Sequence, residues 1–291
     1  PYAMGYARSV TDNHLSQTIM AVAEQKTSGT PAPDMVLWPE NSTDIDPVLD
    51  FESHQIVMGA LAISNRPILV GAVTDGPGKD ERQTASMWWP PSSPQPTSTY
   101  HKRNLVPFGE WIPARSFFLP LIPVLGNIGR QSVPGTTPGV LDATIAGQKV
   151  PVGVVVCFEV AHDGTVADTV RHGAKILAAQ SNNSSFIDTA QTPQQWQITR
   201  TRAVETGRHI VVSTTNSFSG LVNPDGSVAV RTNEGGHTHF TVTMPLESGL
   251  TMGVRIAPWL RVIILVIAAG AIAVSLLQRR RAMLAQANHN R

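Results

Sequence analysis

The chain has 291 residues, of which 42% are hydrophobic and 15% are charged, a smaller charged share than the roughly 25% of soluble domains. This composition excludes a disordered chain, and the 23 glycines and 22 prolines show no three-residue period that would indicate collagen. The net charge is +1, but the last fourteen residues hold four arginines and no acid, which leaves 1 − 4 = −3 for the remainder. A nucleic-acid-binding surface is therefore not expected.

Helical and strand-like patterns alternate through the first 250 residues. In chain order, they predict a helix over 13–24, a strand over 35–38, a helix over 47–64, strands over 67–73, 85–89 and 150–157, a helix over 162–172, a strand over 175–180, a helix over 192–206, and strands over 209–214 and 239–244. A hairpin turn is expected at 223–226, which reads Asn-Pro-Asp-Gly. This alternation predicts a mixed α/β domain in which helices cover buried strands.

Residues 107–138 fit no regular element, because prolines and glycines are spaced along them. A segment of that length inside a compact domain is usually functional, as a lid or a binding surface. Its apolar stretch at 117–122 would suit contact with lipid, and ordinary packing against the domain explains it equally well. Both interpretations stay open at this point.

Residues 256–277 form an apolar run that precedes three consecutive arginines. A helix of that length measures about 33 Å and can cross a hydrocarbon core of about 30 Å if Arg261 extends to the interface beside Trp259. The run has no polar stripe, which favours a transmembrane helix over a buried core helix. The positive-inside rule then places the basic tail 278–291 in the cytoplasm and the domain 1–250 on the extracytoplasmic face. Because the sequence starts with neither a methionine nor a signal peptide, we expect an N-terminal part to precede it.

Cys157 is the one cysteine of the chain, and it follows an apolar strand at a predicted strand-to-helix turn. Backbone N–H groups at a helix start can bind an oxyanion, so this position suits a nucleophile. A buried inert cysteine is the alternative. The nearby His162 and His172 fit helix caps, and His237 and His239 lack a third metal ligand. No metal or other cofactor is expected.

Two charged residues stand out by their surroundings. Glu40 ends a buried strand, where desolvation raises a carboxyl pKa toward that of a general base. Lys102, one of five lysines, leads into the run LVPFGE at 105–110. Each of these signals is weak by itself, because a strand-end carboxylate or a lysine is often simply solvated.

The three segments around Glu40, Lys102 and Cys157 occur in the order of the Glu-Lys-Cys nitrilase superfamily. The run WPEN at 38–41, the run LVPFGE followed by Trp-Ile-Pro, and the terminal span with its arginine tail most resemble the apolipoprotein N-acyltransferases, of actinobacterial type. The resemblance covers roughly residues 10–281. It implies a nitrilase-like αββα sandwich followed by one C-terminal transmembrane helix, at the outer face of the cytoplasmic membrane, with further transmembrane helices preceding it.

The resemblance also implies roles for individual residues. Glu40 would be the general base, Lys102 the cation that stabilises the oxyanion, and Cys157 the acylated nucleophile. The implied supporting positions are Glu110, Phe158, Glu159 and Glu205. In a ping-pong cycle, a phospholipid would acylate the cysteine, and the α-amine of a diacylated lipoprotein would then accept the chain as an amide. No oligomeric state is implied.

This sequence departs from the family pattern at three positions: Phe158 stands for a tyrosine, Asn183 for an acid and Ser185 for a tryptophan. Glu205 fits either a helper of the site or a salt-bridged structural residue. Two further functions stay open for the same fold. One is a membrane-tethered carbon–nitrogen hydrolase with water as the acceptor, and the other is a non-catalytic scaffold.

Overall fold

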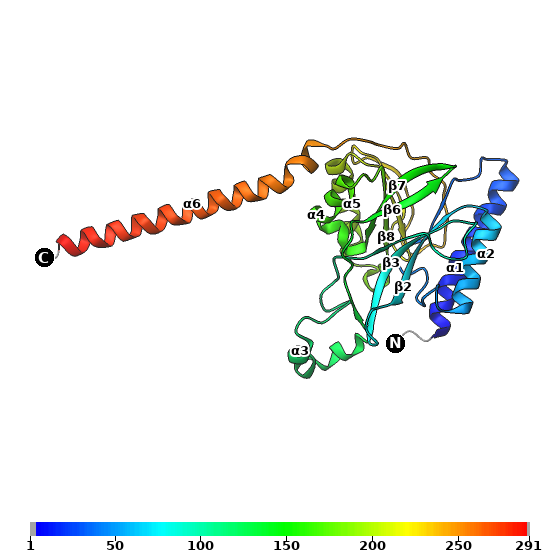
Figure 1. The fold of residues 1–291 in the computed structure, drawn as a ribbon, viewed down its shortest axis with the longest axis horizontal. Coiled ribbons are helices and arrows are strands. Elements are labelled where there is room, and N and C mark those ends of the chain that lie inside the picture. Colours follow the sequence, from blue (N-terminus) through cyan, green and yellow to red (C-terminus); the bar gives the residue numbers. More distant parts are fainter. Residues whose placement is uncertain (1–3, 290–291) are drawn as a thin grey trace. The chain divides into compact units, whose positions relative to one another are not determined.

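The computed structural model describes residues 4–289, and the chain divides between Leu250 and Thr251 into two compact units. The first unit contains two β-sheets with helices on their outer faces, and the second contains one long helix, α6, over Met252–His289 (Figure 1).

The first sheet is mixed. Its strands are β1 (Val36–Leu37), β2 (Ile68–Asp75), β3 (Glu81–Trp89) and β4 (Ser98–His101) in that order, with the short β5 (Gln131–Ser132) on β3. β1 runs parallel to β2, whereas β2, β3 and β4 are antiparallel. Helices α1 (Met4–Ser28) and α2 (Phe51–Ser64) lie side by side on its outer face, where Val57 and Leu61 pack against Ile68 and Trp89.

The second sheet is parallel at its centre. It is built from β11 (Val228–Arg231), β10 (Gly220–Val222), β9 (Ile210–Thr214), β8 (Ile176–Ser181), β7 (Gln148–Val156) and β6 (Val140–Ile145), in that spatial order. β7, β8 and β9 are parallel to one another. Helices α4 (Asp163–Arg171) and α5 (Gln191–Thr206) cover its outer face, where Val166 and Trp196 pack against Val155 and Leu177.

The two sheets pack face to face, which completes the αββα sandwich that the resemblance implied. Val152, Val154 and Val156 of β7 lie between the sheets, in one cluster with Leu69 and Trp88. The intervening Val155 points to the helix side. Successive side chains of a strand point to opposite faces, so those of β7 alternate between the space between the sheets and the helix side. Because both faces are buried, β7 is a nearly continuous apolar run.

The predicted strand over 239–244 is wrong. The structure has no strand between residues 237 and 248, although Val242 and Met244 pack against the core between the sheets. Alternating apolar side chains follow from an extended chain laid on a core, and they do not require a hydrogen-bonded partner strand. The other predicted strands and helices agree with the structure within a few residues, apart from α1, which starts nine residues earlier than the predicted 13. Strands β4, β6, β10 and β11 were not predicted.

Residues 107–138 contain short regular elements that were not predicted. These are α3 (Arg115–Leu121), the 3-10 helix η1 (Pro123–Asn127) and β5. α3 buries none of its residues, and Figure 1 shows it apart from the two sheets. The exposed Phe117, Leu121 and Val124 keep the possibility of contact with lipid open.

The second unit contains a helix that is long and apolar enough to cross a membrane, over Met252–Arg280. The predicted span 256–277 lies within it. The side chains of Arg261 and Arg281, and residues 290–291, lie outside the described part of the chain.

Candidate active site

Cys157 lies at the turn that follows β7. It opens the 3-10 helix η2 (Cys157–Ala161) with φ at 49°, in the left-handed region. A residue with a Cβ pays roughly 1–2 kcal/mol for this conformation, and such strain is concentrated at functional sites. The residue as a whole is half-buried.

The buried carboxylate of Glu159 holds this turn in place. Its Oε2 accepts the backbone N–H of Val156 at 2.9 Å. Its Oε1 accepts the Tyr100 hydroxyl at 2.6 Å and the backbone N–H groups of Arg103 at 2.7 Å and Asn104 at 3.2 Å. Glu159 therefore ties the Cys157 turn to the segment that carries Lys102.

Lys102 directly follows β4 and connects two carboxylates. Its Nζ lies 3.0 Å from Glu40 Oε1 and 3.0 Å from Glu110 Oε1, and the side chain is buried. Burial by itself lowers the pKa of Lys102, but Glu40, Cys157 and Glu110 together raise it above its usual value. The site therefore holds a permanent cation beside the thiol.

Each carboxylate also accepts a backbone N–H group. Glu40 Oε2 accepts from Asn182 at 2.7 Å, and Glu110 Oε2 accepts from Val106 at 2.7 Å. The second bond joins two residues of the LVPFGE run, Val106 and Glu110. Burial raises the pKa of Glu40 and outweighs the opposing effect of Lys102, so this carboxylate is disposed to take up a proton.

The thiol of Cys157 is neutral at rest. Burial raises its pKa to about 12, the Glu40 carboxylate raises it as well, and the Lys102 ammonium opposes both. Sγ lies 3.7 Å from Gln195 Nε2 and 3.9 Å from Asn183 Oδ1. A nucleophilic thiolate therefore requires a base, and Glu40 is the carboxylate that interacts most strongly with it.

The contacts of Phe158 and Glu205 are with residues other than Glu40, Lys102 and Cys157. The Phe158 ring packs edge-on against His162, with the ring centroids 4.8 Å apart. Glu205 is paired with Arg202, which also donates to the Val160 carbonyl at 2.9 Å. The structure thus brings together Glu40, Lys102, Glu110, Cys157 and Glu159, and it places Glu205 in the ion pair that the sequence left as an alternative.

Gln195 is a residue of the site that the sequence did not reveal. It precedes Glu205 by ten residues on α5, which is about 15 Å along the helix axis. The buried residues Thr192, Trp196 and Thr199 mark the inner face of this helix, and Gln195 lies between them at helical spacing. This helical spacing is the sequence signal that could have identified Gln195. The adjacent Gln194 is also a glutamine, so the residue type alone does not show which of the two lies at the site.

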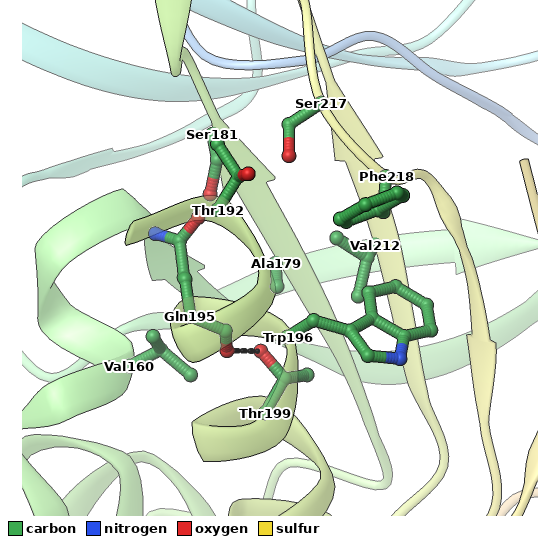
Figure 2. A pocket seen from close by; sticks show the side chains of 10 residues that line it. All are labelled: Val160, Ala179, Ser181, Thr192, Gln195, Trp196, Thr199, Val212, Ser217 and Phe218. Atoms are coloured by element: carbon green, nitrogen blue, oxygen red, sulfur yellow. Dashed lines mark hydrogen bonds between the residues drawn. The ribbon is translucent and has the colours of Figure 1, made fainter. Parts of the chain in front are cut away.

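Gln195 also forms one wall of a small pocket. Figure 2 shows the aromatic rings of Trp196 and Phe218 on one side of it, and Ser181, Thr192 and Gln195 on the other. Gln195 therefore contacts both this pocket and the thiol. Among the residues that the structure describes, no three His, Cys, Asp or Glu side chains are grouped so as to bind a metal.

Gly71 of β2 allows the backbone that carries Glu40 to lie close to the sheet. A Cβ at this position would be 2.1 Å from the Pro39 carbonyl oxygen and 2.8 Å from the Glu40 Cα. Gly71→Ala is therefore expected to destabilise the fold by about 1–3 kcal/mol and to displace Glu40. A lower Tm would show the first effect, and faster alkylation of Cys157 by iodoacetamide would show the second, because the carboxylate that raises the thiol pKa has moved away.

Gly59→Ala in α2 is the matched control, because a Cβ there meets nothing within 4 Å. It is expected to leave the alkylation rate unchanged and to raise or preserve the Tm, since alanine favours a helix over glycine. Equal behaviour of the two variants would show that the approach of Pro39 to the sheet does not position Glu40.

Residues 56–249 match the family described as carbon-nitrogen hydrolase. The chain is 35% identical over 280 residues to the apolipoprotein N-acyltransferase of Mycolicibacterium smegmatis, covering 94% of this chain and 46% of that protein. It is 28% identical over 250 residues to the apolipoprotein N-acyltransferase of Bdellovibrio bacteriovorus, covering 81% and 45%. The chain thus spans about half the length of these relatives.

Two solved structures show the same fold. Nit3 of Saccharomyces cerevisiae, a member of branch 10 of the nitrilase superfamily, matches with a TM-score of 0.55 and 16% identity over 77% of this chain and 82% of that one. An amidase from Nesterenkonia sp. matches with a TM-score of 0.55 and 16% identity over 77% and 81%. At these identities the likeness concerns the fold alone.

Proposed function

Because the chain belongs to the carbon-nitrogen hydrolase family, we propose that it is the catalytic part of an N-acyltransferase that acts on lipoproteins. The fatty acyl chain would come from a phospholipid, pass through a thioester on Cys157, and end on the N-terminal diacylglyceryl-cysteine amine. The observation that carries this proposal is the 35% identity to the mycolicibacterial N-acyltransferase over 94% of the chain. The cluster of Glu40, Lys102 and Cys157 supports it.

In the first half-reaction, Glu40 takes the thiol proton of Cys157 as Sγ attacks the ester carbonyl of the phospholipid. Lys102 offsets the negative charge on the carbonyl oxygen. The carbon–oxygen bond of the ester then breaks, and the lysophospholipid leaves with the proton held by Glu40. The products are a thioester at Cys157 and a neutral alcohol.

In the second half-reaction, the lipoprotein amine attacks the thioester carbonyl, and Glu40 accepts a proton from the amine. The carbon–sulfur bond breaks, the amide leaves, and Cys157 regains its proton. Glu40 suits both steps because burial raises its pKa, and Lys102 keeps its charge throughout. Glu110 holds Lys102 from the other side, and Glu159 supports the turn.

We further assign the parts of the chain to the membrane. Residues 1–250 form the catalytic domain on the extracytoplasmic face, residues 256–277 cross the cytoplasmic membrane, and residues 278–291 form a basic cytoplasmic tail. The apolar helix over Met252–Arg280 and the arginines at its end support this orientation. Such an anchor keeps the domain beside two substrates that are themselves bound to the bilayer.

Intact-protein mass spectrometry of the membrane-embedded protein tests the proposal. After incubation with phospholipid, a hydroxylamine-labile acyl adduct is expected on Cys157, and it should be absent from Cys157→Ala. The adduct should persist in water and move to the amine of an added diacylated lipopeptide. Immediate hydrolysis would instead support a carbon–nitrogen hydrolase, and a folded protein without any adduct would support a scaffold.

Glu205→Gln distinguishes a helper of the reaction from a structural residue. Because Glu205 is paired with Arg202, we expect acyl transfer to stay within about twofold of the unchanged protein, with a loss of at most about 1 kcal/mol of stability. The rate of lipopeptide acylation and the Tm are the measurements. A tenfold slower transfer at an unchanged Tm would instead assign Glu205 to the reaction.

A further inference from the structure

Three side chains at the thiol form a closed ring of hydrogen bonds. The Cys157 thiol donates to Asn183 Oδ1 at 3.9 Å, Asn183 Nδ2 donates to Gln195 Oε1 at 2.6 Å, and Gln195 Nε2 donates to Cys157 Sγ at 3.7 Å. Each group donates once and accepts once. The short bond joins the two amides, so these side chains hold each other while they contact the sulfur.

The structure orients both amides in one sense, and each amide has one accepting and one donating end. Because Asn183 presents Nδ2 to the Gln195 oxygen, the nitrogen of Gln195 is turned toward the sulfur. Asn183 is 4% exposed, so little water competes for its amide. The Gln195 carbonyl accepts the Thr199 hydroxyl at 3.0 Å, the bond drawn in Figure 2, which helps to hold the backbone of Gln195.

We propose that Asn183 and Gln195 are positioning residues, in which Asn183 orients the Gln195 amide so that its N–H stabilises the thiolate of Cys157. The proposal rests on the proposed function only in taking Cys157 as the nucleophile. When Glu40 removes the thiol proton, the bond to Asn183 Oδ1 is lost, and the N–H of Gln195 stays directed at the sulfur. The orientation matters because a reversed amide would present its oxygen to an anion.

The identity of residue 183 is decisive in this arrangement. The chain has asparagine at this position, whose amide both donates and accepts. A carboxylate can only accept, so an aspartate would draw the Gln195 nitrogen toward itself and turn its oxygen to the sulfur. The asparagine therefore gives this chain a donor at the thiol that an aspartate would remove.

The test measures the rate at which iodoacetamide alkylates Cys157 between pH 7 and 10, in the membrane-embedded protein, with the adduct located by peptide mass spectrometry. In this range the rate follows the thiolate fraction, because the thiol pKa is about 12. Gln195→Leu is expected to lower the rate about tenfold, as one unit of pKa would. Gln195→Glu, which keeps the volume and loses the donor, should act in the same direction.

Asn183→Asp is expected to lower the rate at least as strongly. In that background, Gln195→Leu should change the rate by less than about twofold, because the nitrogen is already turned from the sulfur. Gln194→Leu is the matched control, since Gln194 is the exposed neighbour on the same helix and should leave the rate unchanged.

A rate for Gln195→Leu within twofold of the unchanged protein would overturn the proposal, and so would an equal loss in Gln194→Leu. Full additivity of Asn183→Asp and Gln195→Leu would show that residue 183 does not act through Gln195. Alkylation requires neither phospholipid nor lipoprotein. A failure of the proposed acyl transfer would therefore be seen in the absence of the acyl adduct, while the alkylation rates still report on the ring.

Discussion

Lys102→Met is expected to lower the acylation of Cys157 by phospholipid about 100- to 1,000-fold, the loss typical of removing one group that stabilises an oxyanion. Methionine fills a similar volume without charge. The variant also leaves the buried Glu40 and the half-buried Glu110 without the cation that lies 3.0 Å from each of them. One carboxyl should then take up a proton, so Glu40 would be a poorer base as well. The rate of adduct formation, followed by mass spectrometry, is the measurement.

Lys149→Met is the control for this variant. Lys149 is exposed at the start of β7, and its substitution removes the same single positive charge. Its acylation rate should equal that of the unchanged protein. If Lys102→Met acylates at more than a tenth of the unchanged rate, the ammonium does not stabilise the oxyanion, and another donor must be sought near Cys157.

Glu159→Gln is expected to lower the Tm by about 5–10 °C, which corresponds to about 2–3 kcal/mol in a domain of this size. The amide keeps one oxygen for Tyr100, Arg103 and Asn104, but it turns an NH₂ group toward the N–H of Val156, which then loses its acceptor. Because this bond holds the turn at Cys157, acylation should also slow. Thermal unfolding in detergent measures the first effect.

Glu52→Gln provides the comparison, since Glu52 is an exposed glutamate of α2 whose partner is Arg8. Its Tm should change by less than about 2 °C. An unchanged Tm in Glu159→Gln would mean that the buried carboxylate does not hold the turn and that the left-handed conformation of Cys157 is kept by other contacts.

The neutral resting state of the thiol bears on the choice between transfer and hydrolysis. Because burial raises the pKa of the thiol to about 12, the proposed reaction needs Glu40 to take the thiol proton during attack. Burial of Glu40 and Lys102 also limits the water around the cluster. These features suit a thioester that resists hydrolysis until an amine binds. The persistence of the adduct in water is the property that decides between acyl transfer and hydrolysis.

Local patterns predicted most of the long elements of the domain and missed most of the short ones, although the six-residue β6 was missed as well and the two-residue β1 was predicted. The apolar run of β7 and the helical pattern of α5 contain enough residues to show their period. Strands β4, β5, β10 and β11 have two to four residues, too few for a period to appear. At 239–244 the alternating pattern is present but the strand is not. Its apolar side chains reach the core, and its backbone forms no ladder of hydrogen bonds with a neighbouring strand.

The sequence by itself determined the apolar C-terminal helix, the cysteine at a strand-to-helix turn and the carboxylate of Glu40 at a strand end, because each depends on neighbouring residues. Only the tertiary structure decided which of these residues meet. The contact of Lys102 with Glu40 joins positions 62 residues apart, and Gln195 reaches Cys157 across 38. Such contacts follow from how two sheets and their helices pack, and no local period encodes that packing.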